Sequence, residues 1–348
     1  MIFDKILQQY QKQLPFVVYK KPNSSKIIVF LQEDDSNNEF LLNQSGFCFI
    51  SFTSDEKYFL SENSCTILQE DFKDETHSSE YKNEIYFDEN EKIKFEELVS
   101  KALNEISINS FDKVVLSRKE EIAIENFNIA LAFKKMISLY KNAFCYCFFH
   151  TKTGLYFGAT PEQFVKIENT SLATVALAAT QLHTENIVWQ QKEKNEQQIV
   201  TQFLLDSLQP FSTVINFSEP YNHRAGNLVH LKTDIKAQVQ IKDIDKIIKA
   251  LHPTPAVCGF PKDKAKDFIL KNETYKRGFY TGFLGEWNKN FENNTMHQYD
   301  LYVNLRCMKI EEKKATFFVG CGINKDSNPE KEFLETVYKT HTMKKVLF

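Results

Sequence analysis

The sequence has no excess of basic residues. It contains 43 lysine and arginine residues against 46 aspartate and glutamate residues, which gives a formal net charge of −3. Proteins that bind nucleic acids or anionic membrane surfaces usually carry a basic excess that neutralises phosphates. The composition therefore argues against both kinds of partner, whereas a small anionic ligand needs only local charge.

Long apolar runs are also missing. No stretch approaches the roughly 18 apolar residues of a membrane span, and the N-terminus MIFDKILQQYQKQLPF lacks the basic start and apolar run of a signal peptide. The seven cysteines do not show the paired spacing of zinc sites, and most lie among apolar residues, as reduced core cysteines do. These features predict a cytoplasmic protein without a membrane anchor.

Internal repeats and linkers rich in glycine, proline or serine are absent as well. We therefore expect one catalytic domain over residues 1–348, with a strand-rich and poorly distinctive first part up to about residue 100. Apolar spacing predicts helices at 92–106, 127–141, 188–208 and 244–251, and a last helix after the capping sequence SNP. Strands are expected at 111–118, 143–150, 154–169, 171–180 and 228–239, and in FYTGFLGEWN, DLYVNLRCMKI and KATFFVGCGI.

The expected strands come in hairpin-like groups between the helices rather than in strict alternation with them. This order favours an α+β fold with large antiparallel sheets over a parallel α/β fold.

Charged residues in apolar or glycine-rich surroundings are the most informative feature that is present. In the helix at 188–208, Glu193 and Glu196 lie on the same face as Val200 and Phe203. Burying two carboxylates is costly unless a cation accompanies them. A partly exposed helix start whose acids pair with local lysines is the alternative interpretation.

The last helix repeats this pattern, because Glu332, Glu335 and Lys339 fall on one of its faces. Ordinary surface charge would also explain it. The preceding GCGIN, which contains Gly322, favours a site, since glycines before a helix start let backbone N–H groups approach a ligand. Four glutamates from two helix starts could supply oxygen ligands for Mg²⁺.

Lys113 and Glu162 are candidates for proton transfer. Lys113 starts the β-branched segment KVVLS, where an inward-facing lysine is a plausible base because burial disfavours its charged form. Glu162 follows the turn GATP, where a carboxyl group in an apolar pocket can stay protonated and act as an acid. A lysine at a strand edge and a turn acid are the structural alternatives.

Three further residues could contact an anion. Arg306 interrupts the apolar segment LYVNLRCMKI and needs an anionic partner, either an internal carboxylate or that of a substrate. Tyr280 lies between glycines in RGFYTGFLG and could donate a hydroxyl to the same anion, or be a core aromatic residue. His252 lies in the double-proline turn LHPTPAVCGFP, where a structural role is the alternative.

Taken in order, these segments resemble the chorismate-utilising enzymes, a superfamily of isochorismate synthases, salicylate synthases, anthranilate synthase large subunits and aminodeoxychorismate synthases. The resemblance covers residues 105–345, and residues 1–100 correspond to the variable N-terminal part. The matching segments are KVVLSR, GATPE, ALAAT, KEKNEQQIV, HPTPAVCGFP, RGFYTGFLG, NLRCMKI and GCGINKDSNPEKEFLETVYK.

The resemblance implies stacked antiparallel sheets flanked by helices, with chorismate and Mg²⁺ in a cleft. It implies that Lys113 is the base that activates water and that Glu162 is the acid. Glu196 and Glu332 would be primary metal ligands, and Glu193 and Glu335 secondary ones. The substrate would contact Ala179, Thr180, His252, Tyr280, Arg306, Gly322 and Lys339.

Within the superfamily, Lys113 is typical of the water-using members, and Ala178 stands where aminodeoxychorismate synthases carry a lysine. We therefore expect an isochorismate synthase, monomeric and without a glutaminase subunit, whose product feeds menaquinone or catecholate siderophore synthesis. Two departures, Ala179 for glycine and Cys258 for a small residue, are expected to alter kinetics only. The competing hypotheses are a salicylate synthase, against which Ala256 argues, a non-catalytic metabolite binder, and a metal-dependent hydrolase for which no constellation is found.

Overall fold

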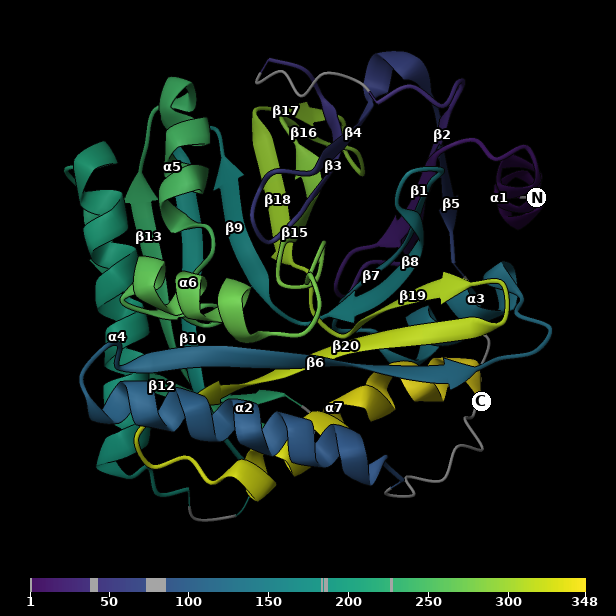
Figure 1. Ribbon diagram of the computed structural model, residues 1–348. Helices are drawn as coiled ribbons and strands as arrows, with labels where there is room; N and C mark the ends of the chain where they lie inside the picture. The colour runs from purple at the N-terminus through teal and green to yellow at the C-terminus, as the bar shows by residue number, and fades with distance from the viewer. Residues whose placement is uncertain (1, 38–42, 73–85, 183, 185–186, 226–227) are drawn as a thin grey trace.

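The computed structural model describes residues 2–37, 43–72, 86–182, 184, 187–225 and 228–348. Two large antiparallel sheets form its centre (Figure 1). The strand order of the first sheet is β14 (Gly259–Phe260), β6 (Lys113–Ala123), β20 (Lys314–Ile323), β19 (Cys307–Glu311), β8 (Gly154–Thr160), β7 (Phe144–His150), β1 (Phe16–Lys20), β2 (Lys26–Gln32) and β5 (Cys65–Asp71).

The second sheet carries the remaining long strands. Its order is β11 (Ile215–Phe217), β13 (Leu228–Gln238), β10 (Ser171–Leu182), β9 (Gln163–Glu168), β18 (Gln298–Val303), β15 (Phe283–Trp287), β3 (Gly46–Ile50) and β4 (Lys57–Ser61), and β12 (Tyr221–Ala225) also pairs with β13. A small ribbon, β16 (Lys289–Asn290) and β17 (Thr295–Met296), lies apart from both sheets. The expected α+β architecture with large antiparallel sheets is confirmed.

Helices cover the outer faces of the sheets. In Figure 1, α2 (Glu89–Ser107) and α7 (Pro329–Leu347) run side by side beneath β6 and β20, and α4 (Gln191–Leu208) packs on β10 and β13 with α5 (Ile244–Leu251) beside it. The other helices are α1 (Ile2–Gln11), α3 (Ile129–Leu139) and α6 (Lys262–Asn272). In the described part of the chain, no helix is long and apolar enough to cross a membrane.

Local sequence explains the helix ends that matter for the site. Helix α7 begins where expected: the side chain of Asn328 accepts a hydrogen bond from the backbone N–H of Lys331 at 3.1 Å, and Pro329 occupies the first turn. Helix α2 begins after Asp88, whose carboxylate accepts from Asn90 N–H at 2.7 Å.

Aromatic side chains fill the space between the sheets. Phe49 stacks on Phe279 with ring centroids 4.2 Å apart, and Phe144 stacks on Tyr302 at 4.4 Å. The many phenylalanines and tyrosines of the sequence are therefore mainly core residues, as their strand-like spacing indicates.

Two expected strands are wrong in extent, and the difference matters for function. GLYFGATPEQFVKIEN divides into β8 in the first sheet and β9 in the second, and DLYVNLRCMKI divides into β18 in the second sheet and β19 in the first. Both halves of each segment are apolar and buried, so alternation alone does not reveal the break. At these breaks the chain passes from one sheet to the other.

Candidate active site

Glu162 and Arg306 lie in the two neighbouring connections between the sheets. Because β8 pairs with β19 and β9 pairs with β18, the β8–β9 and β18–β19 connections run together. The backbone N–H of Val303 donates to the Glu162 carbonyl at 3.0 Å, and the N–H of Ala159 donates to the Arg306 carbonyl at 3.1 Å. Arg306 has a φ of 48°, so it adopts a left-handed conformation directly before β19 instead of interrupting a continuous strand.

The Glu162 side chain is a weak acid in this environment. Burial raises its pKa from 4.5 to about 7, and the positive charges of Lys113, Arg306 and Lys339 lower it only in part. Those charges act on Glu162 although they come from different elements, so the fold brings the predicted base, acid and cationic residues into one electrostatic cluster. A carboxyl group with a pKa near 7 can hold and release a proton at neutral pH.

Lys113 stands at the first position of β6 and is almost fully buried. Its ammonium group lies 2.5 Å from Glu196 Oε1 of α4. This contact joins the predicted base to a predicted metal ligand.

Gly322 supplies the space beside this pair. A Cβ atom at Gly322 would lie 3.1 Å from Lys113 Cε and 3.6 Å from Glu196 Oε1. Two residues earlier on β20, a Cβ atom at Gly320 would lie 3.0 Å from the hydroxyl of Tyr280. The glycines of the GCG segment therefore form a cradle of backbone, against which Lys113 and the Tyr280 hydroxyl lie with no side chain of β20 between.

The first turns of α7 bring two more carboxylates to the same place. Burial raises the pKa of the Cys321 thiol, and the negative charges of Glu335 and Glu332 raise it further, so both carboxylates lie near Cys321, the residue between the two glycines. Burial also disfavours the charged form of Glu335, but Lys339, Arg306 and Lys113 outweigh it and lower the Glu335 pKa. The Lys339 ammonium group lies 2.6 Å from Glu335 Oε1 and donates a hydrogen bond to the Gly320 carbonyl at 2.7 Å.

The guanidinium of Arg306 has no hydrogen bond or ion pair at contact distance with any other described residue. Burial lowers its pKa, while the longer-range charges of Tyr280, Glu335 and Glu162 act in the opposite direction. A half-buried guanidinium without a hydrogen-bonded partner among the described residues fits a ligand carboxylate better than an internal ion pair. Within the described part of the chain, the structure therefore shows no internal carboxylate at contact distance, which the first of the two interpretations of Arg306 requires.

Glu193 supports a cation at the start of α4. Its Oε2 atom is buried and has no hydrogen-bond partner among the described residues, which is unfavourable unless something else satisfies it. Within the same residues, no three acidic, histidine or cysteine side chains gather closely enough to form a metal cage made of protein alone. Mg²⁺ usually keeps several waters and uses only one or two carboxylates together with ligand oxygens. The carboxylates at the two helix starts fit such an open site.

The ALAAT segment contains a β-bulge. Ala179 has a φ of 60°, and the register between β10 and β13 shifts between Ala178 and Thr180 at this point. The Ala179 carbonyl is 3.1 Å from Nδ1 of His230, a residue that the sequence did not single out. Thr180 lies opposite His230 in the ladder, and its side chain lies outside the described residues.

His252 and Cys258 are held by contacts outside this cluster. Nε2 of His252 lies 3.0 Å from the Phe52 carbonyl, its ring packs edge-on against Phe164 and Phe283, and burial lowers its pKa to about 4. Cys258 is fully buried in the core formed by α6, β6 and α7. The contacts of His252 are those of the structural alternative, and among the described residues no hydrogen bond joins it to Lys113 or Glu162.

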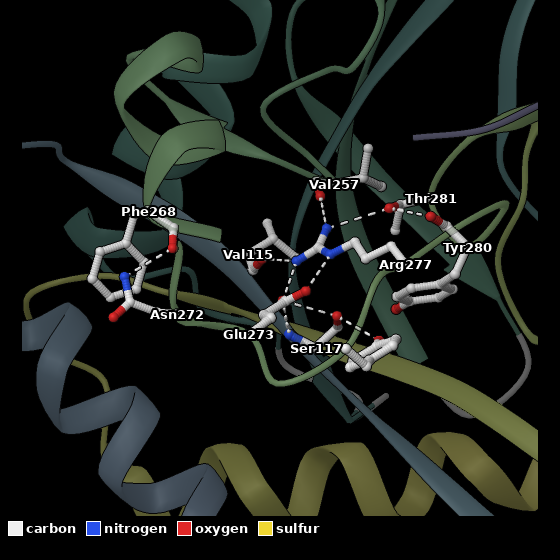
Figure 2. Close-up of polar contacts among 10 residues, drawn as sticks. Val115, Ser117, Val257, Phe268, Asn272, Glu273, Arg277, Tyr280 and Thr281 are labelled. Atoms are coloured by element: carbon white, nitrogen blue, oxygen red, sulfur yellow. Dashed lines mark hydrogen bonds and ion pairs between the residues drawn. The ribbon is translucent and has the colours of Figure 1, made fainter. Parts of the chain in front are cut away.

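Sequence reasoning missed the buried polar groups that hold these elements in place. Asn304 is fully buried in the β18–β19 connection, where it accepts from Tyr146 at 2.6 Å and donates to the Phe279 carbonyl at 2.9 Å. Glu273 and Arg277 form a buried ion pair beside β6 (Figure 2). Only their i, i+4 spacing and the charges in the apolar segment ETYKRGFYTG could have indicated this pair.

A surface groove of ≈680 Å³ lies on the other face of α4, between this helix and β11–β13. Its lining includes Trp189, Phe217 and Tyr221, and none of the predicted site residues. The cluster around Lys113 and the groove are therefore separate features of the molecule.

Comparisons with known proteins identify relatives of this chain. A family model described as chorismate binding enzyme matches residues 47–348. The salicylate biosynthesis isochorismate synthase of Pseudomonas aeruginosa is 29% identical over 278 residues, which is 74% of this chain and 55% of that protein. An isochorismate synthase of Escherichia coli strain K12 is 26% identical over 269 residues, 74% of this chain and 61% of that protein. The chain thus matches about half of the length of these curated relatives.

Solved structures share the fold. A putative 2,3-dihydroxybenzoate-specific isochorismate synthase from Bacillus anthracis superposes with a TM-score of 0.78 at 19% identity, covering 99% of both chains. Anthranilate synthase component I from Streptococcus pneumoniae superposes with a TM-score of 0.69 at 20% identity, covering 88% of this chain and 82% of that one. At these identities the likeness concerns the architecture.

Proposed function

The chain belongs to the chorismate-binding enzyme family, and from this premise we propose that it is an isochorismate synthase. Water adds at C2 of chorismate, the C4 hydroxyl leaves as water, and the ring double bonds shift, so that atoms and charge balance. The observation that carries the proposal is the electrostatic cluster of Lys113 and Glu162, because a water-using member needs one base and one acid at the same ligand.

The two residues divide the proton transfers. Lys113 takes a proton from the attacking water once its own proton has left, and Glu162 gives its proton to the departing hydroxyl. A Glu162 pKa of about 7 supports this role, since a fully ionised carboxylate could not donate. The reaction is reversible, with the two roles exchanged.

Cationic and hydroxyl groups around the cradle bind and orient the substrate. Arg306 and Tyr280 bind the enolpyruvyl carboxylate, Lys339 lies near a second carboxylate, and the backbone at Gly322 contacts the ring. We place Ala179 and Thr180 along the remaining substrate surface, and we assign His252 the structural role that its contacts with Phe52, Phe164 and Phe283 support.

Glu196 and Glu332 would hold Mg²⁺, with Glu193 and Glu335 acting as secondary ligands or through water. When bound, the ion neutralises the ring carboxylate and helps electron density to move out of the ring. Ala178, where amine-transferring relatives need a lysine, supports a water-using enzyme without a glutaminase subunit.

We also propose that residues 1–348 form a single catalytic domain. The pairing of strands β1–β5 supports this, because they join both of the sheets that carry the site.

Product analysis tests the proposed function. The purified protein is incubated with chorismate and Mg²⁺, and the products are separated by chromatography. We expect isochorismate alone, and loss of nearly all activity on addition of EDTA and in Lys113→Ala and Glu162→Gln, whose folding is checked by circular dichroism. Salicylate together with pyruvate would indicate the lyase-containing alternative, and chorismate binding without turnover would indicate a non-catalytic binder.

A further inference from the structure

Glu273 and Arg277 form a fully satisfied buried ion pair. Their side chains are each 2% exposed and their charged atoms are 2.5 Å apart. Every N–H group of the guanidinium has an acceptor: Nε and Nη2 reach the two Glu273 oxygens, Nη1 reaches the Val257 carbonyl and Thr281, and Nη2 also reaches the Val115 carbonyl at 2.6 Å. Burying a pair of charges is costly without such contacts, so this arrangement fixes the side chains in one geometry.

The pair takes the place of a neighbouring strand for β6. On this edge, β14 pairs with β6 only at Lys113 and Val114. Beyond β14, Arg277 donates a hydrogen bond to the carbonyl of Val115. Glu273 Oε1 accepts hydrogen bonds from the N–H of Ser117 at 2.8 Å and from its hydroxyl at 2.9 Å (Figure 2). Two side chains therefore continue the ladder that holds the first residues of β6, immediately after Lys113.

The same network reaches the other side of the cradle. The backbone N–H of Tyr280 donates to the Arg277 carbonyl at 3.0 Å, and Tyr275 contacts the Ser117 hydroxyl at 2.8 Å. The rings of Tyr275 and Tyr280 both stack on Phe318 of β20. One rigid unit thus connects the strand that carries Lys113 to the tyrosine that faces Gly320.

We propose that the Glu273–Arg277 pair is a positioning device, which holds Lys113 and Tyr280 at a fixed separation so that the base meets a substrate anchored by its carboxylate. The inference rests on the proposed function, because that function assigns the base and the anchor. Displacing a base by about 1 Å can cost on the order of 100-fold in rate, so even a small shift of β6 matters.

A matched pair of variants separates positioning from stability. Lys21 and Glu286 form a second buried ion pair, also 2.5 Å apart, with side chains 8% and 1% exposed, whose partner Asp300 and neighbour Tyr19 lie outside the site. Glu273→Gln and Glu286→Gln therefore make the same isosteric change in two comparable surroundings. Ser117→Ala keeps the ion pair and removes one hydroxyl group. This milder variant still tests the proposal if Glu273→Gln does not fold.

Both glutamine variants should lower the melting temperature. Only Glu273→Gln should lower kcat per folded molecule, by about 10- to 100-fold with KM within about threefold of the wild type, and Ser117→Ala should lower kcat by about threefold. A Glu273→Gln kcat within twofold of the wild type, or an equal loss of kcat in Glu286→Gln, would overturn the proposal.

The failure of the proposed function would look different. If the proposed function is wrong, the wild-type protein does not make isochorismate. The positioning role is therefore also tested by a measurement on Lys113 that needs no catalytic turnover. Lysines are labelled with ¹³C during expression, and the Lys113 signal is assigned by its loss in Lys113→Arg. This signal should move in Glu273→Gln and stay in place in Glu286→Gln; a signal unmoved in both variants would refute positioning whatever the wild type produces.

Discussion

Glu162 and Arg306 are held next to each other by the backbone of two sheet-to-sheet connections. Val303 N–H binds the Glu162 carbonyl at 3.0 Å, and Ala159 N–H binds the Arg306 carbonyl at 3.1 Å. The proposed acid and the proposed cationic anchor are thus attached to a pair of hydrogen-bonded connections, each of which continues directly into strands of both sheets. The geometry of the site is therefore a property of the two-sheet architecture itself.

The first prediction concerns pH. If Glu162 is the acid, kcat/KM should fall as the pH rises through about 7, because the carboxyl group loses the proton that it must donate. Initial rates between pH 6 and 9 measure this effect of Glu162, against which the loss of the Lys113 proton acts in the opposite direction. Glu162→Asp keeps a carboxyl group in an altered position, so it should shift the pH at which kcat/KM falls. If the pH profile of this variant is identical to that of the wild type, a group other than Glu162 causes the fall.

The second prediction concerns stability at the same residue. The folded-state pKa of Glu162 lies above its ordinary value, so between pH 4.5 and about 7 the folded protein binds more protons than the unfolded chain and loses stability as the pH rises. Glutamine does not titrate. At pH 8 Glu162→Gln should be more stable than the wild type by roughly 1–2 kcal/mol, allowing for partial exposure, with little advantage at pH 5. Urea unfolding at the two pH values checks this, and a variant less stable than the wild type at pH 8 would contradict it.

Arg306 leads to a third prediction. Because the guanidinium has no partner at contact distance among the described residues, its proposed role is to bind a substrate carboxylate. Arg306→Gln should raise KM for chorismate by at least about tenfold, since a charge-assisted pair contributes roughly 2–5 kcal/mol. Arg306→Lys keeps the positive charge but lacks the planar guanidinium, so its KM should lie between those of the wild type and Arg306→Gln. An unchanged KM in Arg306→Gln would remove the residue from the substrate site.

The sequence predicted the architecture and most of the cluster, for a physical reason. Burial forces apolar periodicity onto strands and helices, and a charge within such a pattern stands out, as Lys113, Glu162 and Arg306 do. Periodicity could not show where β8 ends and β9 begins, because both pieces are buried. It also could not show that Glu196 pairs with Lys113, or that Glu273 and Arg277 support β6. These contacts join residues that are distant in the chain, and no local pattern encodes them.

A fourth prediction comes from the bulge in β10. Ala179 has a φ of 60°, where a Cβ atom is unfavourable and glycine is not. Ala179→Gly should stabilise the protein by about 1 kcal/mol, because relief of the left-handed strain exceeds the extra entropy of glycine in the unfolded chain. Thermal unfolding checks this, with Ala178→Gly, one residue earlier in the regular ladder, as the destabilising control. Equal destabilisation by both changes would mean that the backbone at Ala179 is not strained.

Mg²⁺ gives a fifth prediction that does not require turnover. A cation at the start of α4 would satisfy the buried Oε2 of Glu193, so added Mg²⁺ should raise the melting temperature by a few degrees. Glu193→Ala should weaken this rise and Glu196→Gln should weaken it more strongly. If Mg²⁺ raises the melting temperature of both variants as much as that of the wild type, the ion binds elsewhere.

The most direct measurement of the central claim is the origin of the new hydroxyl oxygen. The enzyme is incubated with chorismate and Mg²⁺ in water enriched in ¹⁸O, the reaction is stopped before appreciable reversal, and isochorismate is analysed by mass spectrometry and NMR. Attack by a water that Lys113 deprotonates predicts one ¹⁸O atom, located at C2, in every product molecule. Isochorismate without the label would show that the hydroxyl group migrates within the substrate, and would contradict the account.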